Sequence, residues 1–172
     1  VVMNSDQSER YSRQIKLPQL GESGQKRLLD ARVLIIGMGG LGSPVAMYLA
    51  AAGVGHLVIS DYDRVDESNL QRQIIHTQAS INELKATSAR DTLLRLNPAI
   101  SIDALGYELD GEELSEQVTQ ADVVVDCTDN FPSRFELNRV SLATGRPVVS
   151  GAAIRWEGQV STFIPKNPDS PC

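Results

Sequence analysis

The stretch VLIIGMGGLGSP, residues 33–44, decides the fold of this 172-residue chain. The apolar residues 33–36 predict a buried strand, and an alanine-rich helix is expected after the glycines. Between them, Gly37, Gly39 and Gly42 form the pattern G-x-G-x-x-G. Glycines let the backbone turn sharply and approach a ligand, while free N–H groups at a helix start attract phosphate. The stretch therefore predicts a nucleotide site, and the alternative is a tight turn whose glycines only allow close packing.

The composition is that of an ordinary globular protein, with 41% hydrophobic and 22% charged residues. A formal net charge of -6 argues against binding to nucleic acid or to an anionic membrane surface, because both favour excess Lys and Arg. Positive charge is therefore expected to be local. No apolar run approaches the ~20 residues of a membrane span, and the polar start has no signal-peptide core. With only Cys127 and Cys172 as cysteines, we expect a cytoplasmic protein without a disulfide framework.

Alternating strand and helix signals predict an α/β fold, a Rossmann-like, largely parallel sheet with helices on both faces. One domain is expected, with an N-terminal helical arm (1–30), a nucleotide-binding core (31–150) and the start of a second half (151–172). The predicted parallel strands are 32–37, 56–61, 100–107, 123–127 and 147–150, and the predicted helices are 41–52, 84–96, 111–119 and 133–143. Partial alternation over residues 154–164 predicts an antiparallel strand at the sheet edge.

Ligands of open parallel sheets collect at the carboxyl ends of the strands, and Asp61 is expected at such an end. It follows the glycine loop by about 20 residues, where a carboxylate commonly meets the ribose of NAD or ATP. The alternative is an aspartate that only caps the following turn. Asp63 is predicted to be exposed or to support a neighbouring site residue.

The polar segment SNLQRQ, residues 68–73, contributes Asn69, Arg72 and Gln73, and Lys85 begins the next helix. Arg72 and Lys85 would place two positive charges beside the start of a helix that binds anions. This is more positive charge than one pyrophosphate requires, and it therefore favours a triphosphate ligand. For either cation alone, a solvated helix face is the commoner explanation.

The segment DCTDN, residues 126–130, follows the apolar strand and contributes two carboxylates. Asp129 is the candidate Mg²⁺ ligand, since this cation prefers oxygen ligands and is held by one or two carboxylates plus substrate phosphates. Asp126, nearer the sheet, is interpreted as structural. Cys127 is interpreted as a small packed residue rather than a nucleophile. Trp156 is predicted to be a packing residue as well.

Together these segments resemble the MoeB and ThiF adenylyltransferases, bacterial relatives of ubiquitin-activating enzymes. The resemblance runs from about Arg10 to Cys172. It is carried by RYSRQI (10–15), GMGGLG (37–42), DYDRVDESNLQRQ (61–73), the Lys85 helix, CTDN (127–130) and SGAAIRWEGQ (150–159). It implies that ATP is a substrate. The C-terminal glycine carboxylate of a ubiquitin-like sulfur carrier ending in Gly-Gly would attack its α-phosphate, giving an acyl-adenylate and pyrophosphate.

The resemblance also implies roles for individual residues. Arg72 and Lys85 would contact the phosphates with Asn69, Asp129 would hold Mg²⁺, and Arg13 would act from the other subunit of a homodimer. By the same resemblance, Gly40 and the neighbouring backbone would contact the nucleotide and Asp61 the ribose. The full set of candidate nucleotide-binding residues, besides Asn69, is Gly37, Gly39, Gly40, Leu41, Gly42, Asp61, Asp63, Gln73 and Asn130.

Members of the resembled family usually continue further and bind a structural zinc ion through two C-x-x-C pairs. Cys172 fits the first of these cysteines, so zinc is expected only in a longer chain, because a structural site needs four ligands.

Two other functions stay open at this point. An NAD-dependent oxidoreductase would explain the glycine loop but not Arg72, Lys85 and Asp129, and a nucleotide-binding fragment without catalysis would need no reacting partner. The molybdopterin and thiamine pathways are not separated, although SGAAIRWEGQ favours the molybdopterin-type relatives.

Overall fold

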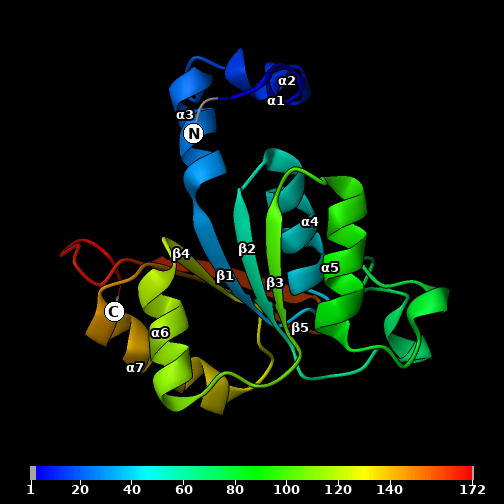
Figure 1. Cartoon of the computed structure of the whole chain (residues 1–172). Coiled ribbons are helices and arrows are strands. Elements are labelled where there is room, and N and C mark those ends of the chain that lie inside the picture. Colours follow the sequence, from blue (N-terminus) through cyan, green and yellow to red (C-terminus); the bar gives the residue numbers. More distant parts are fainter. Residues whose placement is uncertain (1–2, 172) are drawn as a thin grey trace.

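A computed structural model describes residues 3–171 as a six-stranded sheet with strand order β3-β2-β1-β4-β5-β6 (Figure 1). The strands are β1 Arg32–Ile36, β2 His56–Ser60, β3 Ser101–Leu105, β4 Val123–Asp126, β5 Val148–Ile154 and β6 Glu157–Phe163. All neighbouring strands pair in parallel except β5 and β6, which are antiparallel. The predicted Rossmann-like, largely parallel sheet is confirmed.

Helices cover both faces of the parallel strands, as Figure 1 shows. The helices are α1 Ser5–Arg10, α2 Ser12–Ile15, α3 Gly21–Asp30, α4 Gly42–Ala52, α5 Lys85–Leu96, α6 Gly111–Gln120 and α7 Phe131–Thr144, with 3₁₀ turns η1 Glu67–Asn69 and η2 Gln78–Ser80. Within β1, Ile35 belongs to the cluster formed with α4 and α5, whereas Leu34 belongs to the cluster formed with α6 and α7. Both faces of this strand are buried, which is why its sequence is apolar without alternation.

The N-terminal arm consists of α1, α2 and α3 and lies beyond the amino ends of the strands (Figure 1). Tyr11 anchors it, with 1% of its surface exposed. A Cβ atom on Gly53 would lie 2.5 Å from the Tyr11 ring, and the Asn97 amide donates a hydrogen bond of 2.9 Å to the Tyr11 hydroxyl. The arm is therefore packed on the end of α4. No helix within residues 3–171 combines the length and apolar character needed to cross a membrane.

The β5–β6 hairpin corrects one prediction and confirms another. The antiparallel edge strand expected in 154–164 is present, but β5 is longer than the predicted 147–150. The prediction that Trp156 is a packing residue is wrong, because this residue is fully exposed. Ile154 pairs with Glu157, so Trp156 lies in the tight reversal between the strands rather than on a helix-covered face.

Candidate active site

A cavity of about 650 Å³ opens at the carboxyl ends of the parallel strands. It lies where β1 is flanked by β2 on one side and β4 on the other, which is the switch point that binds ligands in open α/β sheets. The predicted site residues that line it are Gly37, Gly39, Gly40, Leu41, Asp61, Asp63, Arg72, Gln73, Lys85, Asp129 and Asn130. Tertiary structure thus brings together segments that are far apart in the sequence.

The glycine loop between β1 and α4 uses its glycines in two ways. Gly37 has a left-handed φ of 96°, and a Cβ atom on Gly42 would lie 1.9 Å from the Gly37 carbonyl oxygen. At these two positions the glycines allow the tight turn and close packing that the sequence left open as an alternative to ligand binding. Gly39 and Gly40 instead leave room beside the side chains of Gln73 and Arg72. The helix α4 begins without a side-chain cap, but the Ser43 N–H already donates to the Gly39 carbonyl at 3.0 Å and Pro44 has no N–H. The N–H groups of Leu41 and Gly42 are therefore the ones left for a phosphate.

Asp61 links the end of β2 to the glycine loop. One carboxylate oxygen accepts a hydrogen bond of 2.7 Å from the Met38 N–H, and the other accepts one of 2.8 Å from the Asp63 N–H. Burial raises the pKa of Asp61, and these two N–H groups oppose that rise. Asp61 therefore does cap the following turn. Its carboxylate can still bind a ribose hydroxyl, because each oxygen has a second lone pair that can accept a hydrogen bond.

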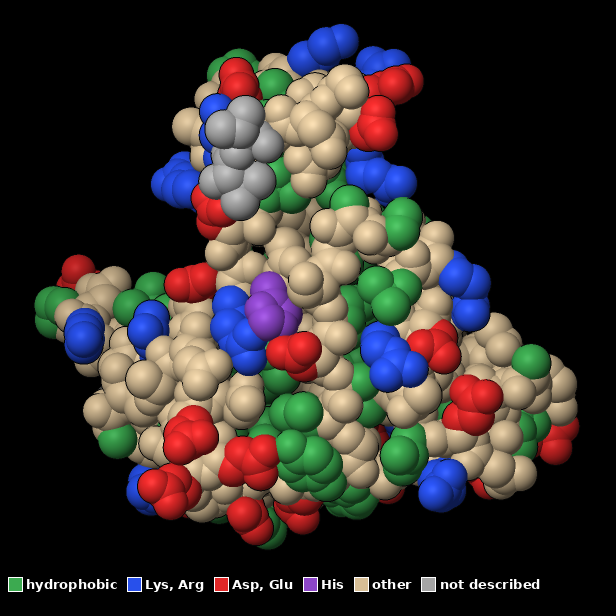
Figure 2. Space-filling model, viewed as in Figure 1, with side chains coloured by type: hydrophobic (Ala, Val, Ile, Leu, Met, Phe, Trp, Pro, Cys, Tyr) green, Lys and Arg blue, Asp and Glu red, His purple; other side chains and the backbone are tan. Residues whose placement is uncertain are grey.

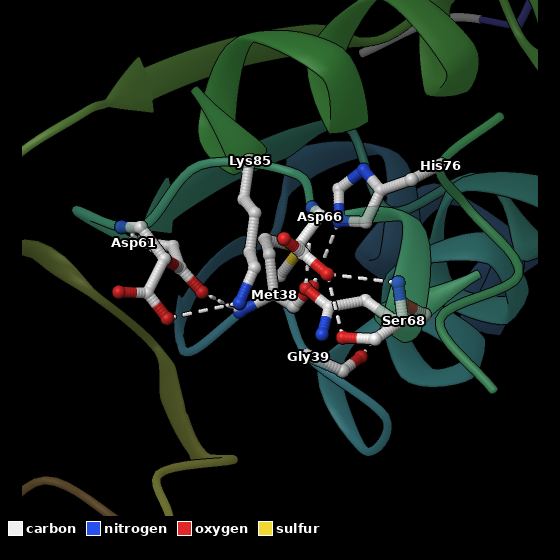
Figure 3. A network of polar contacts seen from close by, with 10 residues as sticks. Met38, Gly39, Asp61, Asp66, Ser68, His76 and Lys85 are labelled. Atoms are coloured by element: carbon white, nitrogen blue, oxygen red, sulfur yellow. Dashed lines mark hydrogen bonds and ion pairs between the residues drawn. The ribbon is translucent and has the colours of Figure 1, made fainter. Parts of the chain in front are cut away.

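Lys85 and Asp63 form the ion pair of the cavity wall. The Lys85 ammonium lies 2.9 Å from an Asp63 carboxylate oxygen, and the exposed fractions of the two side chains are 7% and 55%. Asp63 thus has the exposed, supporting position predicted for it. The ammonium has three donors, so pairing with Asp63 leaves hydrogen-bonding capacity for another anion. In Figure 3, Lys85 lies beside Asp61, on the opposite side of Met38 from His76.

The crossover residues occupy different places. Arg72 is exposed, lines the cavity and donates a hydrogen bond of 3.3 Å to the Ser68 carbonyl. Gln73 is 4% exposed, and its side-chain oxygen has no hydrogen-bond partner among residues 3–171. Asn69 is not among the lining residues, because its side chain caps η1, accepting a long hydrogen bond of 3.4 Å from the Asp66 N–H.

His76 supports the glycine loop, a role that its sequence position does not reveal. Its Nε2 lies 3.0 Å from the Met38 carbonyl, and its Nδ1 lies 2.9 Å from the Ser88 hydroxyl (Figure 3). Since a carbonyl can only accept, we assign the proton to Nε2 and an acceptor role to Nδ1. Burial lowers the pKa of His76, which favours this neutral form.

The segment after β4 contains two carboxylates in different surroundings, the buried Asp126 and the exposed Asp129. Asp126 is 3% exposed and accepts hydrogen bonds from the Thr128 N–H, the Thr128 hydroxyl and the Ser150 hydroxyl at 3.0, 2.7 and 2.8 Å. The structural interpretation of Asp126 is confirmed. Burial raises the pKa of the Cys127 thiol to about 12, so the interpretation of a packed, unreactive cysteine is confirmed as well.

Asp129 is exposed and faces the cavity, while Asn130 caps α7 by accepting a hydrogen bond of 3.0 Å from the Ser133 N–H. Residues 3–171 hold no group of three or more His, Cys, Asp or Glu side chains suited to a metal ion. A Mg²⁺ ion here would therefore depend on Asp129, phosphate oxygens and water, a set of ligands that this hard cation accepts. Cys172, the candidate zinc ligand, lies outside the described residues.

The charge around the cavity is mixed. Figure 2 shows acidic side chains gathered over α6, where the exposed carboxylates are Asp110, Glu112, Glu113 and Glu116. Arg72 and Lys85 bring positive charge to the cavity wall of a chain whose formal net charge is -6. Figure 2 shows Lys and Arg side chains on other parts of the same face as well.

Arg13 is exposed on α2, at the opposite end of the sheet from the cavity (Figure 1). It does not line the cavity of its own chain, so the fold does not bring it together with the other predicted site residues.

The sequence reasoning missed the wall contributed by the segment after β3. Glu108, Leu109 and Leu114 line the cavity there, and Tyr62 lines it beside Asp61. The rule that ligands collect at strand ends would have found this wall, because it applies to the end of β3 as it does to β1, β2 and β4.

The chain is similar to known proteins in both sequence and structure. The model of the ThiF family matches residues 11–172. The chain is 48% identical to the molybdopterin-synthase adenylyltransferase of Escherichia coli and 47% identical to the sulfur carrier protein ThiS adenylyltransferase of the same organism. Each alignment covers 95% of this chain and 65% of the relative.

Longer relatives are also similar. The probable adenylyltransferase/sulfurtransferase MoeZ of Mycobacterium tuberculosis is 46% identical over 97% of this chain, which spans only 43% of that protein. Among solved structures, the crystal structure of selenomethionine PaaA superposes with a TM-score of 0.85 at 25% identity, covering 97% of this chain and 54% of that chain.

Proposed function

Because this chain belongs to the ThiF family, we propose that it uses ATP to activate the C-terminal carboxylate of a ubiquitin-like sulfur-carrier protein. A carboxylate oxygen attacks the α-phosphorus, the bond from that phosphorus to the bridging oxygen of the β-phosphate breaks, and pyrophosphate leaves. The observation that supports this most is the meeting of Arg72 and Lys85 with the glycine loop in one cavity. A triphosphate that loses pyrophosphate needs such cations, whereas hydride transfer from NAD does not.

The residues of the cavity divide the work between positioning and charge. The N–H groups at the start of α4 bind phosphate, and Asp61 orients the ribose through its free lone pairs. Arg72 and Lys85 offset the negative charge that repels the attacking carboxylate and that grows on the leaving pyrophosphate. Asp129 would hold Mg²⁺, which when bound neutralises charge on the phosphates.

Pyrophosphate exchange into ATP tests this proposal directly. With the full-length enzyme, labelled pyrophosphate should enter ATP only when a sulfur carrier with a free C-terminal glycine is present. A carrier lacking that glycine is the matched control. Carrier-independent exchange, or no exchange with any carrier, would reject the proposed reaction.

The carrier itself is identified by the same assay. Because the chain is 48% and 47% identical to relatives named for different carriers, identity alone does not separate them. Molybdopterin-type and thiamine-type carriers are therefore added in turn, and the segment 150–159 leads us to propose that the first supports faster exchange. Tighter calorimetric binding of NAD than of ATP would favour the oxidoreductase alternative instead.

A homodimer in which Arg13 completes the neighbouring site is a second part of the proposal. It is supported by the position of Arg13 away from the cavity of its own chain. Inactive Arg13→Ala and Lys85→Ala enzymes, mixed so that subunits exchange, should recover about a quarter of wild-type activity, because each mixed dimer then has one intact site. No recovery despite verified exchange would reject the arginine in trans and leave the ATP assignment standing.

A further inference from the structure

Arg134 of α7 ties together three segments around the cavity without lining it. Its Nη2 donates hydrogen bonds to the carbonyl of Thr128 and, at 2.7 Å, to the carbonyl of Gly151. Its Nη1 donates to the Ser150 hydroxyl at 3.2 Å. The guanidinium therefore joins α7 to the segment after β4 and to β5.

A buried carboxylate completes this network. The Arg134 Nη1 lies 3.8 Å from an oxygen of Asp126, which is 3% exposed and already accepts hydrogen bonds from Thr128 and Ser150. The guanidinium offsets a negative charge that would otherwise be costly to bury. Thr128 is held at both ends as a result, its N–H by Asp126 and its carbonyl by Arg134.

Asp129 follows Thr128 directly and precedes Asn130, whose side chain caps α7. Its backbone thus lies between two anchored residues, while its own side chain is exposed to the cavity. A carboxylate that holds a metal ion must be placed to within about 0.5 Å, and outer residues usually provide that precision. We propose that Arg134 is a positioning residue that sets the Asp129 carboxylate for the Mg²⁺ of bound ATP, an inference that rests on the proposed function.

The chemistry of the side chain explains why arginine serves here. A guanidinium presents several donors in a rigid plane and can satisfy two carbonyls and a hydroxyl at once, whereas a lysine ammonium is a single point on a flexible stem. An Arg134→Lys variant therefore keeps a positive charge near Asp126 and loses the fork that fixes Thr128. Arg139 on the same helix is the matched control, because it is exposed and its ion pair, at 2.6 Å, is with Glu136.

The test uses the full-length enzyme and two binding measurements. Mn²⁺ replaces Mg²⁺ as an EPR probe of the enzyme saturated with a non-hydrolysable ATP analogue, and calorimetry measures ATP binding in EDTA. Arg134→Lys should weaken Mn²⁺ binding about tenfold, the usual scale for an outer-shell residue, and leave ATP affinity in EDTA within about twofold. Arg139→Lys should change neither quantity.

The outcomes separate this inference from the proposed function. Wild-type Mn²⁺ affinity in folded Arg134→Lys, or an equal loss of ATP affinity in EDTA, overturns the positioning role. Failure of the wild type to bind the ATP analogue at all rejects the proposed function instead. If Arg134→Lys does not fold, Ser150→Ala removes one acceptor of the fork and should weaken Mn²⁺ binding in the same direction, and an unchanged affinity there also overturns the inference.

Discussion

The two ends of the central sheet carry similar charged side chains, but the candidate site lies at the carboxyl ends of the strands. At the amino ends, His56 Nε2 lies 2.8 Å from an Asp103 oxygen, and Arg32 donates a hydrogen bond of 3.0 Å to the Gln117 side chain. At the carboxyl ends, Lys85 pairs with Asp63 at 2.9 Å beside a cavity of about 650 Å³. Residue type alone therefore does not distinguish the two ends.

The backbone makes the difference. At the carboxyl ends of the strands, helices begin, so the N–H groups of Leu41 and Gly42 at the start of α4 are left without a side-chain cap. At the amino ends the helices finish, and their free groups are carbonyls. At the amino ends the Arg32 N–H is already bonded to Asp122 at 2.9 Å, and His56 bonds to Asp103. At the carboxyl ends Asp61 accepts hydrogen bonds from two loop N–H groups. The carboxyl ends thus combine polar side chains with backbone N–H groups that are left for a ligand.

The largest effect should come from Asp129→Asn at the carboxyl end. We expect full-length enzyme with this change to bind ATP and to lose adenylation by about a hundredfold or more, the scale for losing one preorganised electrostatic contact. Pyrophosphate exchange measures the rate, with calorimetry as the check on ATP binding. An unchanged exchange rate would remove Asp129 from the proposed machinery.

Gly42→Ala should destabilise the protein, because the added Cβ atom would collide with the backbone of the glycine loop at the carboxyl end of the sheet. A Cβ atom there would lie 1.9 Å from the Gly37 carbonyl oxygen, so we expect a loss of about 2 kcal/mol or more in the free energy of unfolding measured with urea. Gly39→Ala is the control, since its Cβ would lie 3.5 Å from the nearest side-chain atom, in Gln73. Equal stability of the two variants would contradict the close-packing role of Gly42.

His76 should make stability depend on pH at the carboxyl end. Burial lowers its pKa in the folded protein below the ordinary value of 6.5, so the unfolded chain takes up the proton at higher pH. Stability from this group is therefore full above about pH 6.5 and falls as the pH drops below that value. Urea unfolding between pH 8 and pH 5 should show a smaller acid loss for His76→Gln than for wild type, and parallel profiles would refute this account.

Asp103→Asn should have the smallest effect; Asp103 lies in the middle of β3, and its side chain contacts His56 at the amino end of β2. Its side chain is 53% exposed, and exposed ion pairs contribute about 1 kcal/mol or less. We expect pyrophosphate exchange within about twofold of wild type and a change in unfolding free energy below about 1 kcal/mol. A loss of exchange comparable to that of Asp129→Asn would break the distinction between the two ends.

Much of the site was predictable because its signals are local or follow from one rule of topology. The predicted strand 32–37 and helix 41–52 agree with β1 and α4 to within a residue, since apolar runs and glycines specify the turn between them. Asp61 and Asp129 were predicted because parallel strands end at one edge. The hairpin is harder to predict, because β6 and the end of β5 are largely exposed and show no clear alternation of buried and exposed residues that would reveal their limits. The fully exposed Trp156 lies in its reversal.

The sequence by itself determined the fold class, the nucleotide loop and the polar segments at the ends of the strands, because each depends on neighbouring residues. Only the tertiary structure decided how these groups share their hydrogen bonds. It places Asn69 on a turn cap, His76 under the glycine loop and Arg134 behind Asp129. The His76 partner, Met38, is 38 residues away in the sequence. A polar side chain can form only a few of the hydrogen bonds open to it. Which ones form depends on the backbone and side chains that the fold packs around it.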